Sequence, residues 1–374
     1  MGTAVQTQDY VIVFTASWET FEDTLLFFHS DFRESLLRLS GQPYGDGRAV
    51  GIHVSQLTDD LTFHDYFVIQ DNSLQPCHSD QAIRPVLVHL LHFGEENEIA
   101  AHRRLAQRLS ESGIVIVNPY NDAVAHCDSK FRMSEMLRKQ GVATPQARLV
   151  SRFTEDKTEA VNKIRRRWPA QDVYVQPDRG TEATGCVLLE KQDPQVWQRW
   201  ECIADHDLIV RQRAGNLLYN GRNFVVRINV THDGRDFSAD SGYCMVGGPV
   251  VSAVHGACRE DINEVFGQLG LQHDEINQIR ATACSALQAV STGSKPPRLA
   301  GVDLVLEKHD SLVPYVIDVN PRPVAVGSRI IGCNAIGLGD HFWSGIHEWR
   351  RAAHGGRGPQ LGNVIPNGRN TELR

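Results

Sequence analysis

Two short apolar segments carry polar side chains that could bind a metal ion. One spans residues 301–305 (GVDLV) and the other residues 315–323 (YVIDVNPRP), and the polar loop between them predicts a β-hairpin. Because alternate residues of a strand share a face, Asp318 and Asn320 should point together, toward Asp303. Their oxygens are hard ligands that suit a Mg²⁺ ion shared with phosphate. The alternative is that these side chains only face water, but Asp and Asn are poor strand formers.

Two arginines could add positive charge to such a site. Arg322 follows the hairpin, and its planar guanidinium could bind a phosphate group through two hydrogen bonds. Arg227 lies inside a predicted apolar strand, residues 224–230. An unpaired buried charge is costly, so we expect Arg227 to have an anionic partner.

The elements that must position these residues begin with alternating strands and helices. Strands are predicted at 10–16, 49–54, 66–70, 86–92 and 114–117, and helices at 20–39 and 95–112. This alternation indicates an α/β layer with a mainly parallel sheet. We expect residues 1–118 to form this first domain.

The remaining chain is predicted to form two further lobes, residues 119–207 and 208–354. A helix is predicted at 128–140, with Asp128 or Ser129 as its N-cap and Gly141 as its stop. Strands are predicted at 147–150, 173–175, 186–189, 208–211, 224–230, 302–306 and 315–319, and helices at 155–167, 195–203 and 261–290, with a break at 267–272. The tail, residues 355–374, is rich in Gly, Asn, Pro and Arg and is expected to be mobile.

The composition excludes several functional classes. The 374 residues are too many for one compact core, and 41% of them are hydrophobic, as in ordinary globular proteins. A formal net charge of −7 argues against nonspecific nucleic-acid binding. No apolar run reaches the roughly 18 residues of a membrane span. The eight cysteines show no C-x-x-C pair, which predicts reduced thiols in a cytoplasmic protein.

The predicted hairpin resembles the C-terminal metal-binding hairpin of the ATP-grasp superfamily. The resemblance covers roughly residues 86–330 and implies an N-terminal α/β domain followed by a two-lobed ATP-grasp fold. It implies that Asp303, Asp318 and Asn320 bind two Mg²⁺ ions, for which Mn²⁺ can substitute. Residues 118–150 are similar to the family segment in which a lysine opens a helix, which assigns Lys130 to the ATP phosphates.

Residues 172–190 resemble the family's strand and phosphate-covering loop. The loop residues would be Gly180, Thr181, Thr184 and Gly185, which are small enough for backbone N–H groups to approach phosphate oxygens. Gln176 stands where the family has its second ATP lysine. A glutamine can donate a hydrogen bond to phosphate but supplies no charge. Either another cation, such as Arg179, compensates, or the ATP affinity is reduced.

Two further segments resemble the family's nucleotide-binding strands. Residues 208–215 are similar to the strand that holds the adenine, which implies roles for Arg211 and, near the ribose, Gln212. Residues 221–234 are similar to the strand that carries a basic residue toward the γ-phosphate. Arg227 fits that place and Arg222 is the second choice, with a structural salt bridge as the competing interpretation. By the same resemblance, Arg322 would contact the γ-phosphate or an acyl phosphate.

The first domain also looks like that of D-alanine–D-alanine-ligase-like enzymes over residues 86–119. This resemblance points to amino-acid substrates and suggests substrate contacts for Glu95 and Ser328. His255, in a loop of small residues, is a third candidate.

The resemblance implies an ATP- and Mg²⁺-dependent ligase that activates a carboxylate as an acyl phosphate and joins it to an amine, releasing ADP and phosphate. The partners would be small molecules, without nucleic acid or membrane, and a homodimer is compatible with the family. Two alternatives stay open: a small-molecule kinase with this fold, and a nucleotide-binding protein without catalysis. A nicotinamide dehydrogenase is not favoured because no G-x-G-x-x-G follows the first strand.

Overall fold

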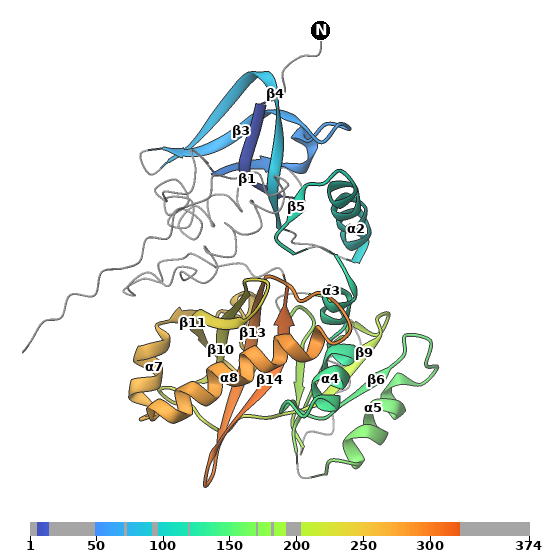
Figure 1. Cartoon of the computed structure of the whole chain (residues 1–374). Helices are drawn as coiled ribbons and strands as arrows, with labels where there is room; N and C mark the ends of the chain where they lie inside the picture. The colour runs from blue at the N-terminus through green and yellow to red at the C-terminus, as the bar shows by residue number, and fades with distance from the viewer. Residues whose placement is uncertain are drawn as a thin grey trace, which may run out of the picture.

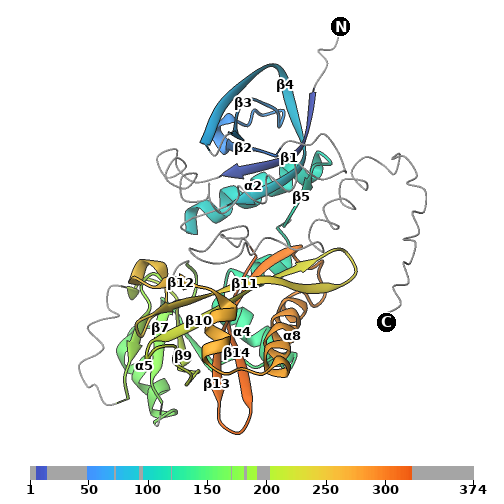
Figure 2. The same ribbon diagram turned by 90° about the vertical axis from the view of Figure 1, so that its left-hand side faces the viewer.

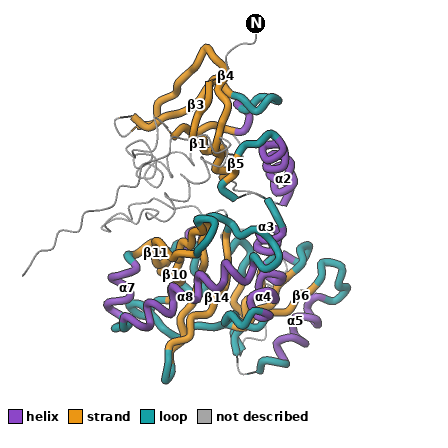
Figure 3. The backbone as a smooth tube through the Cα atoms, viewed as in Figure 1, coloured by secondary structure: helices purple, strands orange, loops and turns teal. Residues whose placement is uncertain are grey.

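The computed structural model describes residues 6–14, 49–70, 73–91, 96–118, 120–169, 171–180, 183–191 and 203–321. These residues form one mixed sheet near the N-terminus and two antiparallel sheets below it in Figure 1. Helices pack on the sheets, as the tube in Figure 3 shows. The predicted class, an N-terminal α/β domain followed by two α+β lobes, is confirmed.

The N-terminal sheet has parallel strands at its centre and an antiparallel strand beside them. Its strands are β1 (Gln6–Phe14), β2 (Ala49–His53), β3 (Phe63–Gln70), β4 (Ser73–Leu91) and β5 (Val115–Ile116). β1 pairs in parallel with β2 and β4, and β4 with β5, whereas β3 is antiparallel to β2 and β4. A 3-10 turn, η1 (Val54–Gln56), follows β2, and helix α2 (Glu96–Glu111) packs its buried Leu105 and Leu109 into the same core. β4 begins well before the predicted strand 86–92, and the helix predicted at 20–39 lies outside the described residues.

The second sheet has four antiparallel strands in the order β6-β9-β7-β8. They are β6 (Ala147–Val150), β7 (Val173–Pro177), β8 (Val187–Leu189) and β9 (Leu208–Gln212), and α5 (Lys157–Arg166) covers one face. β9 pairs with both β6 and β7. The strand that we expected to open the C-terminal lobe therefore belongs to the sheet of the central lobe. The helix predicted at 195–203 lies almost wholly outside the described residues.

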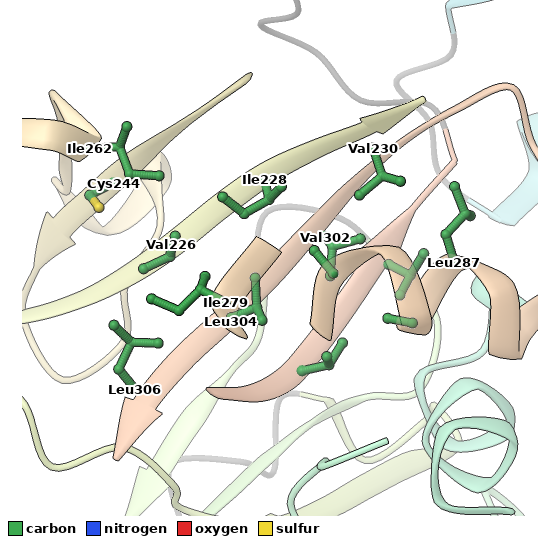
Figure 4. Packing of buried hydrophobic residues seen from close by; sticks show 14 of the residues in the cluster. Val226, Ile228, Val230, Cys244, Ile262, Ile279, Leu287, Val302, Leu304 and Leu306 are labelled. Atoms are coloured by element: carbon green, nitrogen blue, oxygen red, sulfur yellow. The ribbon is translucent and has the colours of Figure 1, made fainter. Parts of the chain in front are cut away.

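The third sheet has five antiparallel strands in the order β12-β11-β10-β13-β14. They are β10 (Asn223–His232), β11 (Phe237–Gly247), β12 (Cys258–Glu260), β13 (Leu299–Lys308) and β14 (Leu312–Asn320). Val226, Ile228 and the alternate residues of β13 pack against Ile279 and Leu287 (Figure 4). Both of those belong to α8 (His273–Val290), which follows α7 (Ile262–Gln268) and the 3-10 turn η3 (Ala253–His255). In Figure 2, α8 lies on one side of β10, β13 and β14, and β7 and β9 lie on the other.

One helix stands where one was predicted at 128–140, and a shorter helix precedes it where none was predicted. α3 (Asp122–Cys127) ends before Ser129, which caps α4 (Lys130–Lys139) by accepting a hydrogen bond from the Arg132 amide at 3.2 Å. Of the two proposed N-caps, Ser129 is thus the one used. Gly141 follows α4 with φ +74°, as its predicted role as the helix stop requires. In the described part of the chain, no helix is long and apolar enough to cross a membrane.

One buried side chain links the first domain to the five-stranded sheet. Asn118 follows β5, is 7% exposed, and accepts hydrogen bonds from the backbone amides of Arg298 (2.9 Å) and Leu299 (3.2 Å). Its amide nitrogen donates to the carbonyls of Leu299 (2.6 Å) and Pro321. Asn118 therefore holds the start of β13 and the residue after β14 in fixed positions.

Candidate active site

The hairpin β13–β14 brings the three predicted oxygen ligands onto one face. Asp303 lies directly opposite Asp318, and Gly301 lies opposite Asn320. Val302 and Leu304 enter the core on the α8 side, so Asp303 points to the opposite face. The register shifts after Asp303, which leaves a β-bulge in β14. Bulges near active sites often change the direction of a side chain.

Arg227 is paired with Asp303 rather than free to approach a ligand. The two residues are opposite one another on β10 and β13, and the guanidinium contacts both carboxylate oxygens. Its Nη2 donates to Oδ2 at 2.8 Å, and Nε donates to Oδ1. Burial opposes the charge on Arg227, but the surrounding acidic groups, Asp303 foremost, together outweigh burial and raise the pKa of Arg227. The structure thus has the salt bridge that was the competing interpretation.

A glycine makes room for this salt bridge. A Cβ atom on Gly301 would lie 2.8 Å from both Cδ and Nη1 of Arg227. Gly301→Ala is expected to push the guanidinium away from Asp303 and lower the free energy of unfolding by about 1–3 kcal/mol. Urea denaturation measures this change. Gly267→Ala is the matched control, because Gly267 lies on α7 with nothing within 4 Å of an added Cβ, and it should be neutral or slightly stabilising. An equal response of the two variants would contradict the proposed crowding.

Lys130 is buried at the start of α4. Its Nζ donates to the Gly180 carbonyl at 2.7 Å, and burial lowers the pKa of Lys130, while Asp318 is the strongest charge acting the other way. Asp178 accepts hydrogen bonds from the Ser129 hydroxyl and the Phe131 amide, both at 2.7 Å. Sequence reasoning missed Asp178, although an aspartate directly after Pro177 is a common turn and capping signal. The fold therefore brings Asp318, which is distant in the chain, close enough for its charge to act on Lys130.

β7 and β9 present polar side chains toward the five-stranded sheet. Tyr174 lies directly opposite Arg211, and Gln176 shares their face because it is two residues farther along β7. The Tyr174 hydroxyl donates to the Pro249 carbonyl at 2.7 Å, and Arg211 Nη1 donates to the Ile317 carbonyl at 2.6 Å. Burial raises the pKa of Tyr174 to about 12, so it remains a neutral donor. These contacts join the two lobes across the face that carries Gln176.

The predicted phosphate loop is described only in part. Gly180 has φ +134° and offers its carbonyl to Lys130, and Thr184 is exposed. Gly185 has φ +70°, and a Cβ there would lie 2.5 Å from Ile203 Cγ2. Packing against Ile203 therefore explains Gly185 without a ligand. Thr181 lies outside the described residues.

The remaining candidate residues either make contacts away from Asp303 and Asp318 or lie outside the described residues. Gln212 follows Arg211 in β9, so its side chain points to the opposite face. The backbone N–H of Gln212 donates to the backbone carbonyl of Gln146 at 2.9 Å. The Arg222 guanidinium donates to the Val246 carbonyl at 3.3 Å, and exposed His255 contacts the Ser252 hydroxyl at 2.7 Å. Three predicted residues, Glu95, Arg322 and Ser328, lie outside the described residues.

The side chains on this face of the hairpin offer oxygen atoms, the kind of ligand that a hard divalent cation prefers. Asp303, Asp318 and Asn320 supply oxygens on one face, although Asp303 already accepts both hydrogen bonds from Arg227. The described residues contain no group of three or more His, Cys, Asp or Glu side chains that could hold a metal ion by themselves. A cation here would therefore need Asn320 and oxygens from a bound ligand as well.

A surface pocket of about 290 Å³ lies elsewhere, lined by Glu135, Arg138, Thr144 and Arg148 among others. None of the candidate site residues lines it. Its position therefore gives no support to a function for those residues.

Solved structures resemble this chain along nearly its whole length. The D-Ala:D-Ser ligase VanG from Enterococcus faecalis has a TM-score of 0.59 at 14% identity, over 93% of this chain and 100% of that one. A D-alanine–D-alanine ligase from Bacillus anthracis complexed with ATP has a TM-score of 0.57 at 14% identity, over 92% and 99%. The ATP-grasp ligase PsnB, solved with Mg and ADP, has a TM-score of 0.50 at 16% identity, over 94% and 100%.

The chain has the ATP-grasp fold. The resemblance inferred from the hairpin sequence is thereby confirmed at the level of the fold. No family model matches the sequence, and no curated protein matches it. At such low identity the comparison shows the fold alone and transfers no residue's role to this chain. The roles of individual residues therefore depend on the contacts described above.

Proposed function

We propose that this chain is an ATP-dependent ligase that joins a carboxylate to an amine and releases ADP and phosphate. The observation that carries the proposal is the meeting of two sets of side chains between the antiparallel sheets. One set is acidic, Asp303 and Asp318 on the hairpin. The other is basic, Lys130 and Arg211, both buried and both acted on by Asp318. Acidic and basic side chains that face each other in this way suit a nucleoside triphosphate with its Mg²⁺ ion.

The proposed roles follow from donor type. Asp303, Asp318 and Asn320 would hold Mg²⁺, which when bound would neutralise phosphate charge. Lys130 would donate hydrogen bonds to phosphate oxygens. Arg227 orients Asp303 and favours its ionised form against the effect of burial.

The chemistry would proceed in two displacements. A carboxylate oxygen of the substrate attacks the γ-phosphorus, the bond to the β-phosphate oxygen breaks, and ADP leaves with that electron pair. The amine nitrogen then attacks the acyl carbon, the carbon–oxygen bond to phosphate breaks, and the amine loses a proton. Catalysis would come mainly from positioning and charge stabilisation.

Amino acids are the proposed substrates. VanG is a D-Ala:D-Ser ligase and the Bacillus anthracis protein is a D-alanine–D-alanine ligase, and their folds match 93% and 92% of this chain. The substrate residues predicted from the sequence, Glu95, Ser328 and His255, remain proposals for that role.

Asp318→Asn tests the proposal with little change in shape. ADP release should be measured with Mg-ATP across a panel of amino acids and amines, with coupled products identified by mass spectrometry. The wild-type protein should release ADP only when carboxylate and amine are both present. Asp318→Asn should lower the rate about 100-fold or more, because it removes a charge that acts in the transition state.

The hairpin offers its own control. Asp310 lies in the exposed turn between β13 and β14, so Asp310→Asn should retain the wild-type rate. ADP release with a phosphorylated product that persists without an amine would indicate a kinase instead. Nucleotide binding without turnover on any substrate pair would favour the non-catalytic alternative.

A further inference from the structure

Arg211 is a buried cation whose hydrogen-bonding capacity is mostly unused. The side chain is 5% exposed, and its Nη1 donates to the Ile317 carbonyl. Its Nε and Nη2 have no hydrogen-bond partner among the described residues. Burying a guanidinium whose N–H donors lack partners is unfavourable. A site that keeps such a charge is built for a partner that comes from outside the chain.

The unused atoms form one edge of the guanidinium. Nε and Nη2 are adjacent, and Arg227 uses the same two atoms to hold both oxygens of Asp303. That edge of Arg211 therefore has the geometry to bind two oxygens of one anion. The partner expected at Arg211 is an oxyanion.

The surroundings of Arg211 contain a second buried cation and two carboxylates. Lys130 is also buried, burial lowers the pKa of both cations, and the charge of Arg211 lowers the pKa of Lys130 further. Of the two nearby carboxylates, Asp178 is already bonded to the Ser129 hydroxyl and the Phe131 amide of α4. Asp318 is the strongest negative charge acting on both cations. An added anion with several acceptor oxygens would complete this cluster.

We infer that Arg211 binds a phosphate group of the nucleotide together with Lys130, and supplies the positive charge that Gln176 does not. Gln176 lies on the same face of the sheet, diagonal to Arg211 in the β7–β9 ladder, so a cation at either position reaches the same region. Arg211 rather than Arg179 is then the compensating cation, and its role is with phosphate rather than adenine. This inference rests on the proposed function, because it names the same nucleotide.

The test uses ATP binding by calorimetry in EDTA, so that metal contributions are absent. Arg211→Gln should raise the Kd for ATP about 10- to 100-fold, the range for hydrogen bonds to charged groups. Adding Gln176→Lys to that variant should bring the Kd back to within about threefold of wild type, because charge returns to the same face. Arg213→Gln is the matched control: Arg213 is paired with Asp172 at 3.1 Å and should leave the Kd unchanged.

A second readout separates binding from structure. If Arg211 serves a ligand, ligand-free Arg211→Gln should unfold at the wild-type temperature or higher, because the variant removes a buried charge whose Nε and Nη2 have no hydrogen-bond partner in the described part of the chain. A lower unfolding temperature would assign Arg211 a structural role and overturn the inference. So would an unchanged Kd for ATP, no rescue by Gln176→Lys, or a change only in the KM of the carboxylate substrate. Wild-type protein that binds no ATP, with or without Mg²⁺, would overturn the proposed function as well.

Discussion

Arg227→Met is expected to lower the free energy of unfolding by about 3–5 kcal/mol, because it leaves the Asp303 carboxylate buried without a counter-charge. The two side chains are only 12% and 17% exposed, so water cannot replace the lost contacts. Urea denaturation monitored by tryptophan fluorescence measures the loss. The exposed pair Arg138–Glu135, with 62% and 31% exposure, provides the control. Arg138→Met should change stability by less than about 1 kcal/mol.

The unfolding free energy lost in Arg227→Met should depend on pH, and the ionisation of Asp303 sets the direction. Burial acts to raise the pKa of Asp303, and Arg227 opposes that effect. In Arg227→Met the folded-state pKa therefore lies above the unfolded value. Stability is then greatest at low pH and is lost as pH rises through the folded pKa, so the variant should differ more from wild type at about pH 8 than at about pH 5.

A double variant separates charge from packing. Arg227→Met with Asp303→Leu removes both charges and should recover most of the stability lost in Arg227→Met alone. A double variant as unstable as the single one would show that packing around Arg227, and not the buried carboxylate, causes the loss.

Asn118→Ala is expected to cost about 3 kcal/mol or more in unfolding free energy. The substitution leaves the amides of Arg298 and Leu299 and the carbonyls of Leu299 and Pro321 without their partner in a buried place. Each unsatisfied buried group costs about 1–3 kcal/mol. Because Pro321 follows Asn320, the variant should also weaken Mg-ATP binding, which calorimetry can measure.

Asn121 is the control for Asn118. It lies three residues later, caps α3 by accepting a hydrogen bond from the Val124 amide at 3.1 Å, and donates to the Lys295 carbonyl at an exposed position. Asn121→Ala should cost about 1 kcal/mol, the usual loss for an N-cap. If Asn118→Ala costs no more than this, Asn118 does not link the two domains as described.

The sequence by itself determined what depends on neighbours in the chain. Alternation of apolar and polar residues was sufficient to predict that Asp303, Asp318 and Asn320 share one face of a hairpin, because side chains in a strand point to alternate faces. Ser129 and Gly141 marked the ends of α4, because caps act within one helical turn. The hairpin pattern was also enough to indicate the ATP-grasp fold.

Only the tertiary structure decided which partners these side chains have. Arg227 needed an anion, but its choice of Asp303 depends on the pairing of β10 with β13, which no local pattern reveals. The strand predicted at 208–211 is present as β9, yet its membership of the four-stranded sheet depends on β6 and β7. β11 escaped prediction because polar residues interrupt its apolar alternation. The sequence also could not predict that Arg211 is buried with Nε and Nη2 lacking hydrogen-bond partners among the described residues. Burial and hydrogen bonding depend on contacts between segments that are far apart in the chain.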